Sequence, residues 1–243
     1  LWFLAAPAAA GAQSLLPSAG FYFQWGPMVS SDPRFAWNGA MGVNVDLVQY
    51  PKGRLTFAAD YEAVLSDQLR AFQLNHENFA LDGAASYDTR YAGLTVAFHH
   101  VSRHLSDQPN PNIVAWNVLD VRATRSVRAG LTTVEGELAY GRVLQHTFVD
   151  YSWTSDIRLT VRRPVDDRVA LFVGGAGHLV GVEKEKYGRD GQCGARLEAG
   201  VRVNGRAVAL DIFAGYERRV DGFPTELTRM RAFVFGFRFT KPS

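Results

Sequence analysis

The chain has 243 residues, of which 47% are hydrophobic and 21% are charged, and its formal net charge is +2. These values exclude a disordered chain, a helical membrane protein with spans of about 20 apolar residues, and a strongly basic nucleic-acid-binding protein. The single cysteine, Cys193, excludes an intramolecular disulfide and a zinc site built from cysteines.

The first residues are apolar and rich in alanine. Residues 1–12 contain small-x-small patterns and no charge, which predicts the end of a secretory signal peptide with cleavage after Ala12. The alternative is a short apolar anchor helix, which Pro7 and Gly11 disfavour. We therefore expect residues 13–243 to form the mature, exported domain.

From residue 35 onward, apolar and polar residues alternate with a period of two, which predicts β-strands. No helical pattern of comparable length competes. Eleven strands are expected, most of about 10–14 residues. They cover 35–50, 54–62, 78–88, 91–104, 112–125, 130–143, 152–163, 168–182, 192–203, 205–218 and 227–239.

Three features favour a transmembrane β-barrel over a soluble barrel. The strands exceed the usual five or six residues and match the roughly 9–11 residues that cross a bilayer at a tilt. Aromatic residues such as Tyr50, Tyr140 and Trp153 stand at strand ends, and short and long connections alternate along the chain. The last strand carries a row of phenylalanines from Phe233 to Phe239, similar to the C-terminal signature of outer-membrane barrels.

The alternating connections also predict the strand number. If the long connections are extracellular, an additional strand must precede residue 35, and residues 20–28 are the candidate. The expected fold is therefore a 12-stranded antiparallel barrel in the bacterial outer membrane. The alternatives are 10 strands, or 11 strands with the N-terminal segment inside the lumen.

The polar faces of the strands interleave acidic and basic residues, as with Asp82, Asp120 and Arg122. Opposite charges at cross-strand distance attract each other. We therefore expect an ion-paired interior filled by side chains, with a wide pore as the alternative.

One stretch could carry chemistry. In the strand 91–104, the row that faces lipid continues at its outer end into His100, Ser102 and His104. If Asp88 pairs with Tyr91 across a tight turn, Glu77 lies opposite Ser102 on the same face. A histidine can take the proton of a serine hydroxyl, and a carboxylate can hold the imidazole, so Ser102, His100 and Glu77 form a candidate catalytic triad.

Further residues of this stretch could bind substrate, namely Arg103, His104 and Asp107. The alternative is a non-catalytic rim whose polar side chains contact lipopolysaccharide. His100 and His104 are about 13 Å apart along a strand, so one metal ion could not bind both, and we expect no metal and no cofactor.

The segment from His100 to Asp107 resembles the His-x-Ser-Ser-His-Leu-Gly-Asp motif of an uncharacterised family of outer-membrane barrels. Residues 32–34, Asp-Pro-Arg, also look like that family, whereas Arg103 and Ser106 depart from the motif. This resemblance implies a barrel in the outer membrane and no particular activity.

The pair His100 and Ser102 at a lipid-facing strand end is also similar to the lipid A 3-O-deacylases, small barrels with an external His-x-Ser and a glutamate on the following strand. In this chain the following strand places Asn117 on the lipid face and Asp120 in the lumen. The resemblance implies an esterase that acts on lipid A.

Two functions are therefore expected. One is a serine esterase that modifies lipid A or lipopolysaccharide from the outer leaflet. The other is a non-catalytic structural barrel or a narrow solute channel. In both cases the expected partners are outer-membrane lipid and lipopolysaccharide, without nucleic acid, and the barrel is expected to be monomeric.

Overall fold

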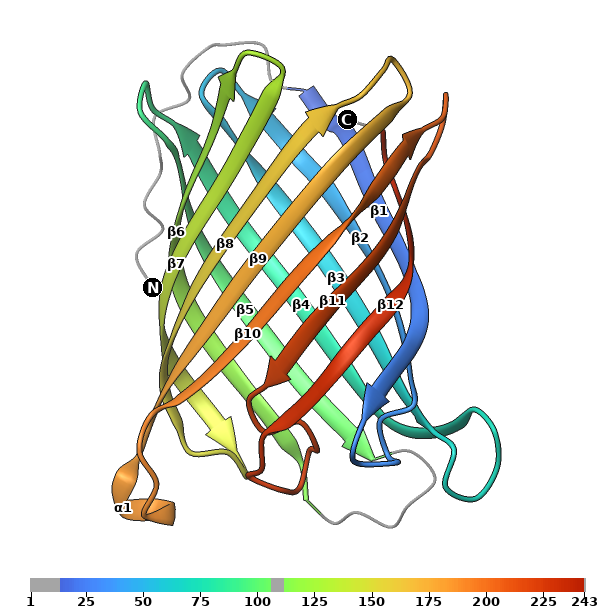
Figure 1. The fold of residues 1–243 in the computed structure, drawn as a ribbon. Helices are drawn as coiled ribbons and strands as arrows, with labels where there is room; N and C mark the ends of the chain where they lie inside the picture. Colours follow the sequence, from blue (N-terminus) through green and yellow to red (C-terminus); the bar gives the residue numbers. More distant parts are fainter. Residues whose placement is uncertain (1–13, 106–111, 243) are drawn as a thin grey trace, which may run out of the picture.

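The computed structural model describes residues 14–105 and 112–242, which form a closed antiparallel β-barrel (Figure 1). Each strand pairs with its neighbours in sequence, and β1 pairs with β12 to close the barrel. The strands are β1 (Ser14–Ser30), β2 (Trp37–Tyr50), β3 (Gly53–Ser66), β4 (Gln73–Asp88), β5 (Gly93–Leu105), β6 (Val114–Ala129), β7 (Thr132–Thr147), β8 (Tyr151–Pro164), β9 (Val169–Val182), β10 (Gln192–Asn204), β11 (Ala209–Arg219) and β12 (Met230–Thr240).

The predicted 12-stranded barrel is confirmed, including the strand expected at residues 20–28. This segment belongs to β1 and lies in the barrel wall, where Trp25 pairs with both Gly39 of β2 and Phe237 of β12. The predicted signal peptide at residues 1–12 lies outside the described residues.

The outer surface of the barrel is apolar on every strand. Large hydrophobic side chains that are 42–63% exposed occur on all twelve strands: Phe21, Val43, Phe57, Leu81, Val96, Val121, Leu138, Leu159, Val173, Leu197, Ile212 and Phe235. A continuous apolar belt of this kind would be unstable in water and suits the hydrocarbon core of a bilayer. The described residues contain no helix that is long and apolar enough to cross a membrane.

The two ends of the barrel differ in their connections. The end drawn at the top of Figure 1 carries turns of two to four residues, whereas the other end carries most of the longer links and the short helix α1 (Lys184–Tyr187). The link 148–150 is shorter than expected, because β7 continues to Thr147 and β8 begins at Tyr151. By the rule that long loops of such barrels are extracellular, the end with the longer links is called the outer end below.

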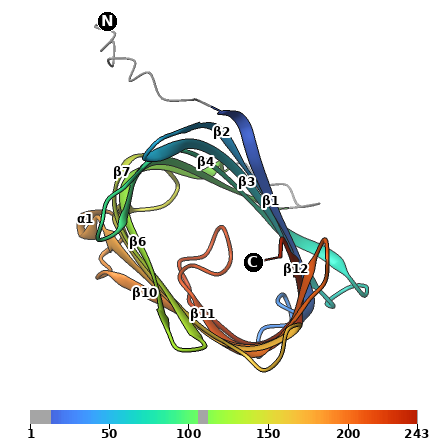
Figure 2. The same ribbon diagram turned by 90° about the horizontal axis from the view of Figure 1, so that it is seen from above.

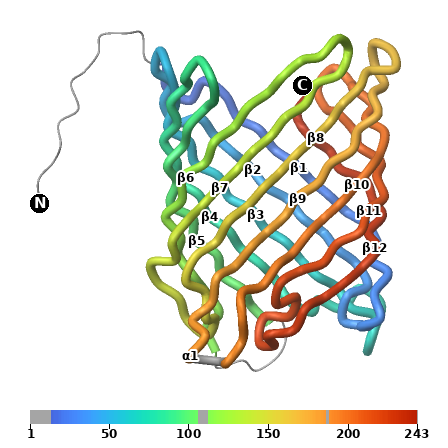
Figure 3. The backbone as a smooth tube through the Cα atoms, turned by 60° about the vertical axis from the view of Figure 1, so that its left-hand side comes forward, coloured from blue at the N-terminus to red at the C-terminus, as the bar shows by residue number. Residues whose placement is uncertain are grey.

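The strands are strongly inclined to the barrel axis (Figure 3) and enclose an ion-paired interior. Arg202 bonds to Asp211 with an Nε–Oδ1 distance of 2.6 Å, and Arg122 bridges Asp82 and Asp120 at 2.6 and 2.8 Å. The expected ion pairing is therefore confirmed. The interior is not completely filled, because two adjoining cavities of about 870 and 500 Å³ remain.

A loop folds into the outer mouth of the barrel. Residues 220–229 follow β11 and fold inward, as the view along the barrel in Figure 2 shows, and Val220 to Phe223 are buried. Arg189 holds this loop by bonding to Asp221 at 2.7 Å and to Asp150 at 2.6 Å. Tyr151 Oη donates a further hydrogen bond of 2.7 Å to Asp221.

A second ion pair ties this loop to the link between β1 and β2. Arg34 bonds to Glu226 at 2.6 Å and to Asp32 at 2.7 Å. Hydrogen bonds from the guanidinium keep the pKa of both carboxyl groups below their ordinary values. The two loops are therefore tied together at neutral pH.

Candidate functional site

Polar side chains interrupt the apolar belt at the outer ends of four neighbouring strands, β4 to β7. They are Glu77, His100, Ser102, His104, Asn117 and Gln145, and we call this group the external polar surface. It occupies the part of the lipid-facing wall nearest the outer end, where headgroups would meet the protein.

Alternation along β5 divides its residues between the two sides of the wall. His100 and Ser102 continue the row of Val96 and Phe98, which are 52% and 46% exposed on the lipid side. Arg103 points into the lumen, where its Nη1 donates a 2.5 Å hydrogen bond to the Asp221 carbonyl oxygen. The expectation that Arg103 binds substrate beside Ser102 is therefore not supported, because the two side chains lie on opposite sides of the wall.

The register between β4 and β5 differs from the expected one by two residues. The turn between these strands has four residues, and Asp88 pairs with Gly93 instead of Tyr91. Thr89 stabilises this longer turn by donating a 2.7 Å hydrogen bond to the Ala92 carbonyl oxygen. As a result, Glu77 shares the face of Ser102, as predicted, but lies opposite His104.

His100 is held by an asparagine on the next strand. His100 and Asn117 are directly opposite each other on β5 and β6, and the distance from Nδ1 to Oδ1 is 2.6 Å. Asn117 Nδ2 in turn donates a 3.2 Å hydrogen bond to Gln145 Oε1 on β7. This second bond orients the amide so that its oxygen accepts from His100 Nδ1–H, which leaves His100 Nε2 free to accept a proton.

Ser102 also has a second histidine neighbour. His104 Nε2 lies 3.4 Å from Ser102 Oγ, and the His104 ring packs edge-on against Phe79 with centroids 5.4 Å apart. Glu77 accepts a 2.6 Å hydrogen bond from Tyr61 Oη. Glu77, the carboxylate predicted to hold His100, therefore lies beside His104 instead. The side-chain amide of Asn117 holds His100.

The role of Asn117 was missed at the level of sequence, although its position on the lipid face could be read from the alternation of β6. Its pairing with His100 depends on the register across the link 106–113, which alternation does not define. The predicted substrate contact Asp107 lies outside the described residues.

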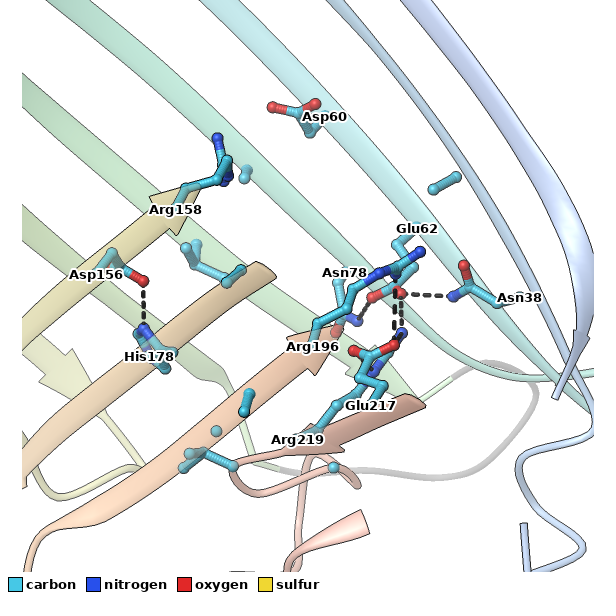
Figure 4. A pocket seen from close by; sticks show the side chains of 18 of the residues that line it. Asn38, Asp60, Glu62, Asn78, Asp156, Arg158, His178, Arg196, Glu217 and Arg219 are labelled. Atoms are coloured by element: carbon cyan, nitrogen blue, oxygen red, sulfur yellow. Dashed lines mark hydrogen bonds and ion pairs between the residues drawn. The ribbon is translucent and has the colours of Figure 1, made fainter. Parts of the chain in front are cut away.

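The lumen offers a different kind of site. In the cavity shown in Figure 4, Glu62 accepts hydrogen bonds from Asn38 and Asn78 at 2.5 and 2.6 Å and pairs with Arg219 at 2.7 Å. On the opposite wall, His178 bonds to Asp156 at 2.6 Å. These contacts pair Glu62 with Arg219 and Asp156 with His178 across the strands, which is the arrangement of a structural network. Within residues 14–105 and 112–242, no cluster of three or more potential metal ligands is present.

Comparison with known sequences yields no match to a protein-family model and none to a curated protein. Comparison with solved structures yields barrels of similar architecture. Outer membrane phospholipase A from Escherichia coli, solved as an active-site mutant with asparagine replaced by alanine, has a TM-score of 0.60 and 12% identity over 94% of this chain and 92% of that chain.

Two further neighbours show the same architecture. The phospholipase of Salmonella typhi, a dimer with bound calcium, has a TM-score of 0.58 and 12% identity over 93% and 91% of the two chains. An outer-membrane channel from Pseudomonas putida F1 has a TM-score of 0.55 and 11% identity over 97% and 98%. At such low identity these likenesses establish the fold alone. With the apolar belt and the closed strand order, they show that the chain is a β-barrel of the bacterial outer membrane.

Proposed function

We propose that this barrel is a serine esterase that removes an acyl chain from lipid A or lipopolysaccharide in the outer leaflet. The observation that carries the proposal is the hydrogen bond between His100 Nδ1 and Asn117 Oδ1 on the same lipid-facing surface as Ser102. This bond fixes the imidazole tautomer that a general base requires.

The reaction follows from these roles. Ser102 Oγ attacks the carbonyl carbon of an acyl ester, and its proton passes to His100 Nε2. The protonated imidazole then gives this proton to the departing alkoxide, so that the deacylated lipid leaves and an acyl-serine remains. Water attacks the acyl-serine with His100 again as the base, which releases a fatty acid and restores the Ser102 hydroxyl.

The geometry sets one requirement for this reaction. His100 and Ser102 are two residues apart on one strand, about 6.6 Å along its axis. In the structure Ser102 Oγ contacts His104, so the hydroxyl must rotate about χ1 to meet His100. His104 is therefore the alternative base, with Glu77 opposite it.

Two comparisons bear on the substrate. The phospholipase neighbours support an acyl-ester lipid as the substrate and add glycerophospholipid to the candidates. The active site of the Escherichia coli enzyme includes an asparagine, which agrees with a role for Asn117.

The alternative function is a narrow solute channel. The channel neighbour and the luminal cavities are the observations that support it.

The test is mass spectrometry of lipid A and of glycerophospholipid after incubation with the purified, detergent-folded protein. We expect loss of an acyl chain with the natural sequence and at least about 100-fold slower loss with Ser102→Ala. The control is Ser155→Ala, which removes a hydroxyl on β8 that donates to the Ala139 carbonyl oxygen.

Each outcome is informative. Hydrolysis of glycerophospholipid alone would retain the serine esterase and overturn lipid A as its substrate. Unchanged spectra of both lipids with a folded barrel, or full activity of the Ser102→Ala variant, would overturn the esterase.

A further inference from the structure

One arginine lies on the lipid-facing side of the wall beside the external polar surface. Arg142 is exposed on β7 between Tyr140 and Leu144, which are 61% and 57% exposed on the same face. Across the described parts of the chain, no side chain forms a hydrogen bond or ion pair with its guanidinium. An arginine that faces the bilayer without a partner costs free energy that increases with depth, so its position indicates an anion supplied by lipid.

The neighbours of Arg142 indicate its depth. It pairs across the strands with Leu119 on β6 and with Trp153 on β8. The Trp153 ring stacks on Tyr140 with centroids 6.0 Å apart. Tryptophan and tyrosine favour the level of the headgroups at a membrane surface, which is where lipid phosphates lie.

Arg142 lies on the same lipid-facing side of the wall as the candidate catalytic residues. Its strand, β7, carries Gln145, which accepts the hydrogen bond from Asn117. The strand of Ser102 is two strands away, which is roughly 10 Å at about 4.8 Å per strand. The residue of β5 in line with Arg142, through Leu119, is Phe98, and Ser102 lies four residues further along β5, or about 13 Å. The two Cα atoms are therefore about 17 Å apart. The long side chain of Arg142 spans part of this interval, and a lipid whose phosphate and ester span the rest can contact both residues.

The charge around Ser102 is asymmetric. Glu77 on β4 lies on one side of the serine, and Arg142 on β7 lies on the other. An anionic headgroup is therefore attracted to the β7 side and repelled from the β4 side. This arrangement orients a bound lipid with its phosphate toward Arg142 and its ester toward Ser102.

We infer that Arg142 binds the phosphate of the substrate lipid and makes the enzyme selective for phosphate-bearing acyl lipids over neutral ones. The inference rests on the proposed function, because it assigns the headgroup side of the same site. The Arg142 guanidinium can bind the phosphates of lipid A and those of glycerophospholipids equally, because both accept charge-assisted hydrogen bonds.

The test compares hydrolysis of phosphatidylethanolamine and of diacylglycerol with identical acyl chains in mixed micelles. We expect the natural sequence to prefer the phospholipid, and Arg142→Gln to lose about 10-fold in kcat/KM on the phospholipid alone, mainly through KM. Arg142→Lys should retain part of the preference. The matched control is Arg125→Gln, which removes an exposed lipid-facing arginine near the opposite end of β6.

A second measurement separates this inference from the proposed function. The Ser102→Ala variant is compared with the Ser102→Ala, Arg142→Gln double variant for retention of phosphatidylethanolamine and of monophosphoryl lipid A by native mass spectrometry. Weaker retention of either lipid by the double variant supports the phosphate site even if no lipid is hydrolysed. Equal retention, or equal hydrolysis of charged and neutral lipids by the natural sequence, would overturn the role of Arg142 and leave the esterase intact.

Discussion

At the scale of single residues, the proposed esterase raises the question of which histidine would activate Ser102. His100 is fixed by a short hydrogen bond to Asn117, which is itself fixed by Gln145. His104 is closer to the serine but is held mainly by the Phe79 ring. A base must keep one tautomer and one orientation through the reaction, and this requirement favours His100.

We therefore expect Asn117→Ala to lower kcat/KM about 10-fold, because a hydrogen bond to an imidazole that becomes charged is worth about 1.5 kcal/mol. Hydrolysis rates in mixed micelles measure this effect. Glu77→Gln, which keeps an oxygen for the Tyr61 hydroxyl, should lower the rate far less than Asn117→Ala does. The opposite result, a large loss for Glu77→Gln and none for Asn117→Ala, would make His104 the base.

At the scale of elements, alternation in the sequence was sufficient to predict the strands but not their exact pairing. The faces of His100, Ser102 and Glu77 follow from a period of two, and all three were assigned to the lipid side correctly. The pairing depends on turn length, and the Thr89 hydroxyl stabilises a turn of four residues that alternation alone does not reveal. A shift of two residues leaves each side chain on the same face of the sheet but changes its cross-strand neighbour. The predicted face of Glu77 is therefore correct, whereas its predicted partner Ser102 is replaced by His104.

The inward loop 220–229 bears on the alternative function, a solute channel, because it lies in the outer mouth of the barrel. The side chains of Asp150 and Asp221 are 0% and 4% exposed, and Arg189 is the cation that neutralises both. Arg189→Met would leave two buried carboxylates without a charge partner, at a cost of about 3–5 kcal/mol. We expect this variant to release the loop, with a rise in single-channel conductance in planar bilayers and faster proteolysis within residues 220–229.

The same outer end provides the control for that variant. Lys184→Met removes an ion pair with Asp190 whose side chains are 73% and 85% exposed, and exposed pairs contribute little to stability. It should leave conductance and proteolysis unchanged. Steady conductance by the natural sequence would show that the mouth is open and would favour the channel.

At the scale of the whole molecule, the two faces of the sheet differ in character because successive side chains of each strand point alternately to the lumen and to the lipid. On β5, His99 bonds to Asp82 inside the barrel at 2.5 Å, while the adjacent His100 bonds to Asn117 outside. The inner face stabilises the wall through ion pairs, and the outer face presents polar groups to lipid at a position that the wall keeps rigid. Rigid positioning is what the proposed catalytic surface would require, because correct orientation of the reacting groups lowers the barrier.

The stability of this wall can be tested at the Arg202–Asp211 pair, which joins β10 to β11 directly across the strands. The pair has two hydrogen bonds of 2.6 and 2.9 Å, and its side chains are 9% and 3% exposed. Asp211→Leu would leave the guanidinium buried without its partner, so we expect a loss of about 3–5 kcal/mol in the free energy of unfolding. Urea titration of the barrel in lipid vesicles, followed by heat-modifiable gel mobility, measures this loss.

Two further variants separate the charge from the packing. Replacing both residues, as Arg202→Met with Asp211→Leu, removes the unpaired charge and should recover most of the stability, because apolar side chains of similar size can replace a buried ion pair. Glu137→Gln alters a pair with Arg158 that is 3.6 Å long and 68% exposed on the arginine side, so it should cost less than about 1 kcal/mol. If Asp211→Leu unfolds at the same urea concentration as the natural sequence, this luminal ion pair does not stabilise the wall. The rigidity of the external polar surface must then come from the backbone hydrogen bonds of the closed sheet.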